Sequence, residues 1–225
     1  MTTLTPRELA GLIDHTLLKP EATATDIKEL CREAVTYGFK AVCLNPCYVP
    51  LAQQELNGAP VLICSVIGFP LGADTTKTKI TAALEALSAG AVELDVVMNI
   101  GFFKSGLYRE TTEDLRLFVQ AAKEANPKVL VKVILENCLL TDQEKETACN
   151  LAVEAGADFV KTSTGFSLSG ATVADVKLMR QTVGPHIGIK AAGGIRTLPD
   201  ALSMLEAGAT RLGASNSIAI LRGEK

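Results

Sequence analysis

The chain has 225 residues, 48% of them hydrophobic, and its formal net charge at pH 7 is −3. This length suits one large α/β domain or two small ones, and it is ample for a sizeable core. The mild acidity argues against a nucleic-acid or anionic-membrane surface, which would need clustered basic residues. No apolar run is long enough to span a bilayer, and Met1 to Leu9 lacks the charged-then-apolar pattern of a signal peptide.

Strand-like and helix-like patterns alternate along the chain after a short helix expected at Pro6 to Leu9. Apolar runs predict strands at 12–17, 41–44, 61–67, 92–97, 129–135, around Lys161, at 188–191 and at 211–213. Helices are expected from Thr25 to Gly38, at 48–56, 75–88, 110–125, 141–155, 172–183 and 198–207, and as a short last segment. Eight strand-then-helix units without a linker predict an α/β fold, a single-domain (β/α)8 TIM barrel over residues 1–225, rather than an open sheet.

Two patterns predict buried groups. The helix that begins near Thr25 carries a 3.6-period stripe, which consists of Ile27, Leu30, Cys31, Ala34 and Val35. Six cysteines, none in Cys-x-x-Cys spacing, indicate buried thiols in a reducing compartment. We therefore expect a soluble, cytoplasmic protein.

Strand alternation assigns several charged residues to the barrel interior. In the fourth, fifth and seventh strands one face is an unbroken Val/Leu/Ile surface, which the helices should cover. The opposite faces place the charged residues inward, and these are Glu93, Asp95, Lys132, Lys161 and Lys190. Buried charges are costly unless they pair, and we favour a structural ion pair for Glu93 and Lys132. Asp95, Lys161 and Lys190 lie nearer the C-terminal strand ends, where barrel enzymes carry their chemistry.

These three residues fit the chemistry of a lysine nucleophile. Burial and a neighbouring cation lower the pKa of a lysine amine and expose its lone pair. Lys190 is a candidate for the cation and Lys161 for the nucleophile, which would form a Schiff base with a carbonyl carbon. Asp95, alone or through a water, could move the protons that this reaction requires. Taken alone, a lysine at position 161 is more often a strand-end residue that points into solvent, because most lysines are exposed.

Two small-residue loops predict a phosphate site. Residues 191–195 follow the seventh strand, and residues 213–217 follow the eighth and open the last helix. Barrel enzymes often bind phosphate there through backbone N–H groups. No nucleotide-phosphate motif occurs, and with only two histidines the chain is poorly supplied with metal ligands. His15 is expected to be a hydrogen-bonded structural residue.

The charged strands and their loops resemble the signature segments of the deoxyribose-phosphate aldolase family. The lysine segments are the specific part of this resemblance, which covers nearly the whole chain through residues 13–16, 67–72, 92–99, 159–166 and 189–196. It implies a class I aldolase, a lyase that reversibly splits 2-deoxy-D-ribose 5-phosphate into D-glyceraldehyde 3-phosphate and acetaldehyde. It also implies a cytoplasmic enzyme of deoxyribose phosphate catabolism, without a metal or organic cofactor, that is commonly a homodimer.

The resemblance also implies residue roles. Lys161 would be the Schiff-base lysine, Asp95 a proton donor and acceptor, and Lys190 the second lysine. The phosphate would be bordered by small residues, which are Gly165, Gly193, Gly194, Gly213 and Ser215. Some relatives carry a lysine in place of Phe166, so binding here would depend more on backbone N–H groups. Some also end in a longer tail with a terminal tyrosine that reaches the site, whereas this chain stops at Lys225.

Two other functions fit the same pattern. Another class I aldolase or a transaldolase could act on a ketose phosphate with the same lysine chemistry. A non-catalytic phosphosugar-binding barrel would form no covalent adduct. We expect small-molecule phosphosugar and aldehyde substrates, with neither nucleic acid nor membrane as a partner.

Overall fold

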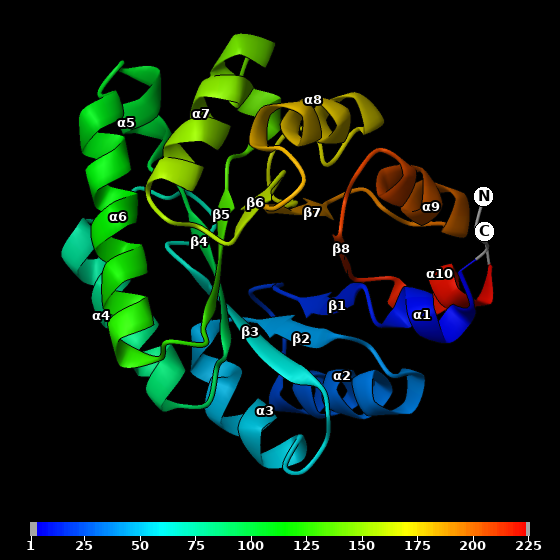
Figure 1. Cartoon of the computed structure of the whole chain (residues 1–225). Coiled ribbons are helices and arrows are strands. Elements are labelled where there is room, and N and C mark those ends of the chain that lie inside the picture. The colour runs from blue at the N-terminus through cyan, green and yellow to red at the C-terminus, as the bar shows by residue number, and fades with distance from the viewer. Residues whose placement is uncertain (1–3, 224–225) are drawn as a thin grey trace.

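The computed structural model describes residues 4–223, so the predictions on residues 1–3 and on the chain end at 224–225 lie outside it. Eight parallel strands close a barrel in sequence order, with β1 paired to both β2 and β8 (Figure 1). The strands are β1 Ile13–Leu17, β2 Ala41–Leu44, β3 Leu62–Ile67, β4 Glu93–Val97, β5 Leu130–Ile134, β6 Phe159–Lys161, β7 Gly188–Ala192 and β8 Arg211–Ala214. The predicted (β/α)8 barrel is confirmed.

The helices form a ring outside the strands (Figure 1). They are α1 Pro6–Ala10, α2 Ala24–Tyr37, α3 Val49–Glu55, α4 Thr76–Ser88, α5 Ile100–Lys104, α6 Tyr108–Ala125, α7 Asp142–Glu154, α8 Val173–Val183, α9 Leu198–Glu206 and α10 Ser217–Arg222. Two 3-10 helices, η1 Pro46–Tyr48 and η2 Asn137–Leu139, and the five-residue α5 were not predicted. Each is too short to show a periodic pattern. Within residues 4–223, no helix has the length and apolarity needed to cross a membrane.

Threonine caps explain why three helices begin one residue later than predicted. Thr75, Thr141 and Thr172 are not the first helical residues but the N-caps of α4, α7 and α8. Each side chain accepts a hydrogen bond from a backbone N–H of the first turn, which would otherwise lack an intrahelical partner.

The main core lies between the outer face of the barrel and the helices. Its strand residues include Leu94, Val133 and Ile189, which are fully buried, as the outward Val/Leu/Ile face predicted. The prediction was wrong for Val35, which is 47% exposed because it lies beyond the edge of the buried face of α2.

The prediction of buried thiols holds for four of the six cysteines. Cys31, Cys43, Cys64 and Cys149 are buried, whereas the other two are not. Cys47 is exposed in η1 and Cys138 is half-buried in η2. Both helices lie in the segments that follow strands β2 and β5. All six thiols are free.

The barrel interior has an apolar part and a charged part. Strands β2 and β3 contribute small and apolar side chains, with Ala41, Cys43, Cys64 and Val66 in one cluster. The inward side chains of β1 and β4 to β8 include seven charged groups, which are Asp14, Glu93, Asp95, Lys132, Lys161, Lys190 and Arg211. The charged part positions the candidate site.

Candidate active site

Asp95 on β4 lies at the centre of the charged cluster. Its Oδ2 atom is 2.7 Å from Lys161 Nζ and 2.8 Å from Lys190 Nζ. All three side chains are buried, and the two lysines are directly opposite each other in the register of β6 and β7. The structure therefore brings together the three predicted catalytic residues, with one carboxylate oxygen linking the two amines.

Lys132 on β5 is both an ion-pair partner of Glu93 and a neighbour of Asp95. Its Nζ is 2.6 Å from Glu93 Oε2, which confirms the expected pair. It is also 2.8 Å from Asp95 Oδ1, the oxygen that faces away from Lys161. Lys132 thus belongs to the same charge network as the predicted catalytic residues.

Two further buried charges, Asp14 on β1 and Arg211 on β8, complete the network and were not predicted. Asp14 Oδ2 is 2.5 Å from Lys190 Nζ, and Asp14 Oδ1 is 2.6 Å from Arg211 Nη1. Arg211 also donates to both oxygens of Glu93, at 3.0 and 3.1 Å. Strand alternation was the available signal, because both residues share the inward parity of their strands.

The cluster contains one more positive group than negative groups. Three carboxylates face three lysines and one arginine, all buried. Burial favours the neutral amines of Lys132 and Lys190, but the facing carboxylates outweigh it, and the pKa of each lysine is raised. Burial would likewise raise the pKa of Asp95, but the charges of Lys132, Lys161 and Lys190 hold it well below its usual range. Asp95 is therefore an anion that accepts hydrogen bonds from ammonium groups.

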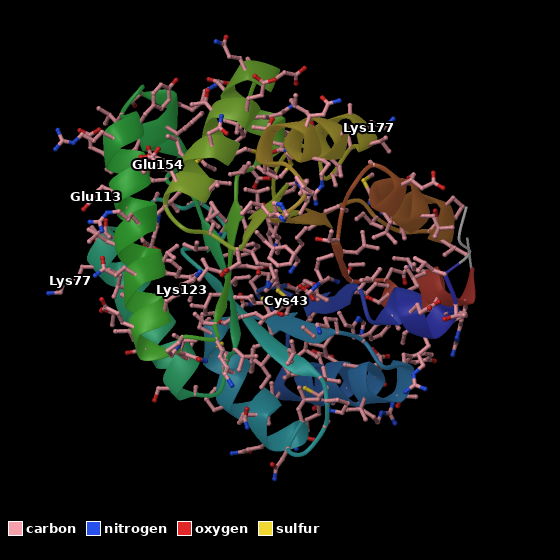
Figure 2. All side chains as sticks on the ribbon, in the orientation of Figure 1. Cys43, Lys77, Glu113, Lys123, Glu154 and Lys177 are labelled. Atoms are coloured by element: carbon pink, nitrogen blue, oxygen red, sulfur yellow. The ribbon has the colours of Figure 1, made fainter. Side chains whose placement is uncertain are left out.

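Two thiols lie beside Asp95 on the apolar side of the barrel. Figure 2 shows Cys43 within the ring of strands, whereas the labelled Lys77, Glu113 and Lys177 lie on the outer helices. Cys64 Sγ is 3.1 Å from Asp95 Oδ1, and the ligand atoms of Cys43, Cys64 and Asp95 lie within 4.8 Å of one another. Lysine amines already contact both oxygens of Asp95, so this geometry favours ammonium partners over a metal ion.

A pocket of about 320 Å³ opens above Lys161 at the C-terminal ends of the strands. It is lined by Lys161 and by all five predicted phosphate residues, which are Gly165, Gly193, Gly194, Gly213 and Ser215. Gly213 has a second role, because a Cβ there would lie only 3.0 Å from Lys190 Cε. The small-residue loops and Lys161 thus line the same pocket.

The pocket has further walls, of which Lys19 and Arg196 were not predicted. Lys19 and Arg196 are exposed cations at its edge, and Thr164 lines it beside Gly165. Phe166 also lines it, and its ring packs edge-on against Phe69 at 5.2 Å between ring centroids. Charged and aromatic side chains at a loop edge have no periodic signal, so only the folded chain shows them together.

His15 is a structural residue, as expected. Its Nε2 is 2.8 Å from Glu33 Oε2 on α2, and its Nδ1 is 3.0 Å from Ser217 Oγ on α10. The ring is buried on the outward side of β1, on the opposite parity from Asp14. His15 therefore links α2 and α10 to β1 through side-chain contacts and does not face the charged cluster.

Removing the Lys132 amine is expected to destabilise the protein. In Lys132→Met, Glu93 and Asp95 each lose a buried cation, so the free energy of unfolding should fall by about 3–5 kcal/mol. Urea denaturation would measure this change. The control is Lys77→Met on the exposed surface of α4, where a change within about 0.5 kcal/mol is expected. Equal effects of the two substitutions would contradict a paired role for Lys132.

Acid is expected to weaken the cluster through Asp14. Burial alone would raise the pKa of Asp14, but the charges of Lys190, Lys132 and Arg211 lower it to about 2. A carboxyl group with a lowered folded-state pKa stabilises the protein above its unfolded pKa, near 4, and this contribution is lost as the pH falls toward 2. Urea denaturation between pH 5 and pH 2 should show a loss of about 2 kcal/mol from this group. Asp14→Asn should reduce the slope of stability against pH, and an unchanged slope would contradict the assignment.

Comparisons with known proteins show which family the chain matches. The sequence model of the DeoC/LacD family aldolases matches residues 9–223. The chain is 56% identical over 216 residues to a deoxyribose-phosphate aldolase of Carboxydothermus hydrogenoformans, covering 96% of this chain and 95% of that protein. It is 57% identical over 213 residues to that of Clostridium novyi, covering 95% of each.

Solved structures show the same architecture. The deoxyribose phosphate aldolase from Aeropyrum pernix, described as a unique tetrameric structure, superposes with a TM-score of 0.91 at 37% identity, covering 97% of this chain and 91% of that chain. A putative deoxyribose-phosphate aldolase from Coccidioides immitis superposes with a TM-score of 0.92 at 41% identity, covering 98% and 86%.

Proposed function

Because the chain belongs to the DeoC/LacD family of aldolases, we infer that it catalyses the reaction described below. Its activity is that of a deoxyribose-phosphate aldolase, a class I aldehyde-lyase of deoxyribose phosphate catabolism. The enzyme reversibly cleaves 2-deoxy-D-ribose 5-phosphate to D-glyceraldehyde 3-phosphate and acetaldehyde. The single observation that carries the residue roles is the contact of one Asp95 oxygen with the amines of Lys161 and Lys190.

Lys161 is the proposed nucleophile because it is the basic group of the cluster with the fewest carboxylate contacts. Among residues 4–223 it contacts one carboxylate, whereas Lys132 contacts three and Lys190 two. The cluster has one positive group in excess, and withdrawing the Lys161 amine from it breaks a single ion pair, the smallest loss among the three lysines. Lys161 also lines the pocket, so its free amine can meet a carbonyl group.

The proposed reaction begins when Lys161 attacks the C1 aldehyde of the open-chain substrate. Loss of water from this adduct gives a protonated imine, which draws electrons toward nitrogen. The C3 hydroxyl then loses its proton, the C2–C3 bond breaks, and glyceraldehyde 3-phosphate leaves an enamine on Lys161. Protonation of C2 and hydrolysis of the imine release acetaldehyde and restore the amine.

Asp95 and Lys190 are the proposed proton carriers. The Oδ2 atom of Asp95 contacts both amines, so a proton can pass from one lysine to the other through a single oxygen. The raised pKa of Lys190, against the opposing effect of burial, keeps a positive charge beside Lys161. General acid–base help of this kind contributes about 10²–10⁴-fold to the rate.

The phosphate group is proposed to bind at the small-residue side of the pocket. Gly165, Gly193, Gly194, Gly213 and Ser215 would border it, and their short side chains allow backbone N–H groups to approach the phosphate oxygens. The exposed cations Lys19 and Arg196, at the edge of the same pocket, would add charge complementarity.

Borohydride trapping tests the residue roles. The protein is incubated with acetaldehyde or deoxyribose 5-phosphate, reduced, digested and mapped by mass spectrometry. We expect the reduced adduct on Lys161. An adduct on another lysine, or none, would overturn the assignment, and preferential trapping of dihydroxyacetone phosphate would indicate a ketose-phosphate aldolase instead.

We also propose that residues 1–225 form one catalytic domain that assembles into a homodimer or a higher homo-oligomer. The tetrameric description of the Aeropyrum pernix relative supports self-association. The six free thiols support a cytoplasmic location, where cysteines stay reduced.

A further inference from the structure

Glu136, just beyond the end of β5, has an unusual backbone and an unusual carboxylate. It has a left-handed conformation, with φ 59° and ψ 61°, and within residues 4–223 it is the only non-glycine residue with a positive φ. Its side chain is buried at 2% exposure. In contrast to the three acids of the barrel cluster, it has no ion-pair partner in the described part of the chain. A buried carboxylate on a residue with a strained backbone costs free energy, so neighbouring groups must stabilise it.

Thr164, in the loop after β6, supplies the two N–H and O–H donors of this carboxylate, and the Cys138 thiol lies 3.9 Å from Glu136 Oε1. The Thr164 backbone N–H donates to Glu136 Oε1 at 3.2 Å, and the Thr164 hydroxyl donates to Glu136 Oε2. The same hydroxyl oxygen accepts a hydrogen bond from the Phe166 N–H at 3.0 Å. Glu136 therefore holds Thr164 directly and Phe166 through the Thr164 hydroxyl, and these two residues flank Gly165.

The held segment packs tightly against the second phosphate loop. Gly193 has a positive φ of 82°, and a Cβ on it would lie 3.3 Å from Gly165 Cα and 3.0 Å from Gly170 Cα. The backbones of Gly165 and Gly193 therefore approach so closely that position 193 has no room for a side chain. Both Gly165 and Gly193 line the pocket next to Lys161.

We propose that Glu136 is a positioning residue for phosphate recognition: through Thr164 it fixes the backbone of Gly165 against Gly193 in the phosphate pocket. This proposal rests on the proposed function and deepens it. A carboxylate suits the role because two donors of one residue meet two acceptor oxygens. A glutamine offers a single acceptor oxygen and would turn its NH₂ group toward one of these donors.

Glu136→Gln is expected to weaken phosphate recognition without removing the lysine chemistry. The KM for deoxyribose 5-phosphate and the Ki of inorganic phosphate as a competitive inhibitor should both rise about tenfold, as expected for the loss of a charged hydrogen bond. Acetaldehyde carries no phosphate, so its half-saturating concentration in borohydride trapping of Lys161 should change much less. A merely structural role would raise all three values together.

Three further variants complete the test. Thr164→Val, which removes the hydroxyl link, should reproduce the split between phosphate and acetaldehyde, whereas Thr164→Ser, which keeps the hydroxyl, should retain the phosphate constants of the unmodified protein. The matched control is Glu154→Gln on the exposed face of α7 (Figure 2), which should leave all three values unchanged. Unchanged phosphate constants in both Glu136→Gln and Thr164→Val, or parallel changes in all three constants, would overturn the proposal. Absence of an acetaldehyde adduct in the unmodified protein would instead overturn the proposed role of Lys161.

Discussion

Lys161→Met is expected to abolish both the cleavage of deoxyribose 5-phosphate and the borohydride-trapped adduct. Methionine retains an unbranched side chain of similar size but has no amine, so the imine that draws electrons from the C2–C3 bond cannot form. Neither neighbouring lysine can replace it as the nucleophile, because Lys132 contacts three carboxylates and Lys190 contacts two. The kcat should fall to the background of the assay, as measured by coupled detection of glyceraldehyde 3-phosphate.

The fold should survive this substitution. Lys161 contributes only one ion pair, and Asp95 keeps its contacts with Lys132 and Lys190. Lys177→Met on the exposed face of α8 is the matched control and should retain full activity. A folded Lys161→Met protein that still cleaved the substrate at more than about 1% of the normal rate would refute the Schiff-base assignment.

Asp95→Asn is expected to lower kcat by about 10²–10⁴-fold, the usual contribution of a general acid–base group. The amide cannot accept and return a proton, and it removes the anion that links the amines of Lys161 and Lys190. Trapping of acetaldehyde on Lys161 should be weakened but still detectable, because the nucleophile itself remains. Steady-state kinetics and trapping in parallel would measure the two effects.

Removing the buried negative charge of Asp95 also lowers the free energy of unfolding, and a matched variant separates this effect from the catalytic one. Asp114 on α6 pairs with Lys79 on α4 at 2.8 Å, and both side chains are buried outside the barrel. Asp114→Asn should therefore lower the free energy of unfolding, as Asp95→Asn does, but should leave kcat near normal. A similar fall of kcat in both variants would indicate that Asp95 acts only through stability.

Local alternation along each strand was sufficient to place the main catalytic candidates. Asp95 and Lys190 alternate with apolar residues such as Leu94, Val96 and Ile189, and the two-residue period of a strand turns them away from the covering helices. The same period predicted the pair of Glu93 and Lys132, whose atoms meet at 2.6 Å. These inferences needed no knowledge of distant contacts.

The partners of these residues depend on closure of the barrel. Asp14 and Arg211 lie 197 positions apart in the chain and meet only because β1 pairs with β8. Their contact sets the distribution of charge around Lys190, and no local pattern indicates it. Neither did the pattern indicate that Lys132 would reach Asp95 as well as Glu93.

The amino-acid order by itself determined the eight βα units, the inward side chains and the position of the small-residue loops, because periodicity and turn chemistry act over a few residues. Tertiary structure alone decided which charges pair, how Thr164 is held by the left-handed Glu136, and which loops share the pocket of Lys161. These contacts join segments whose separation is fixed only when parallel strands close into a ring.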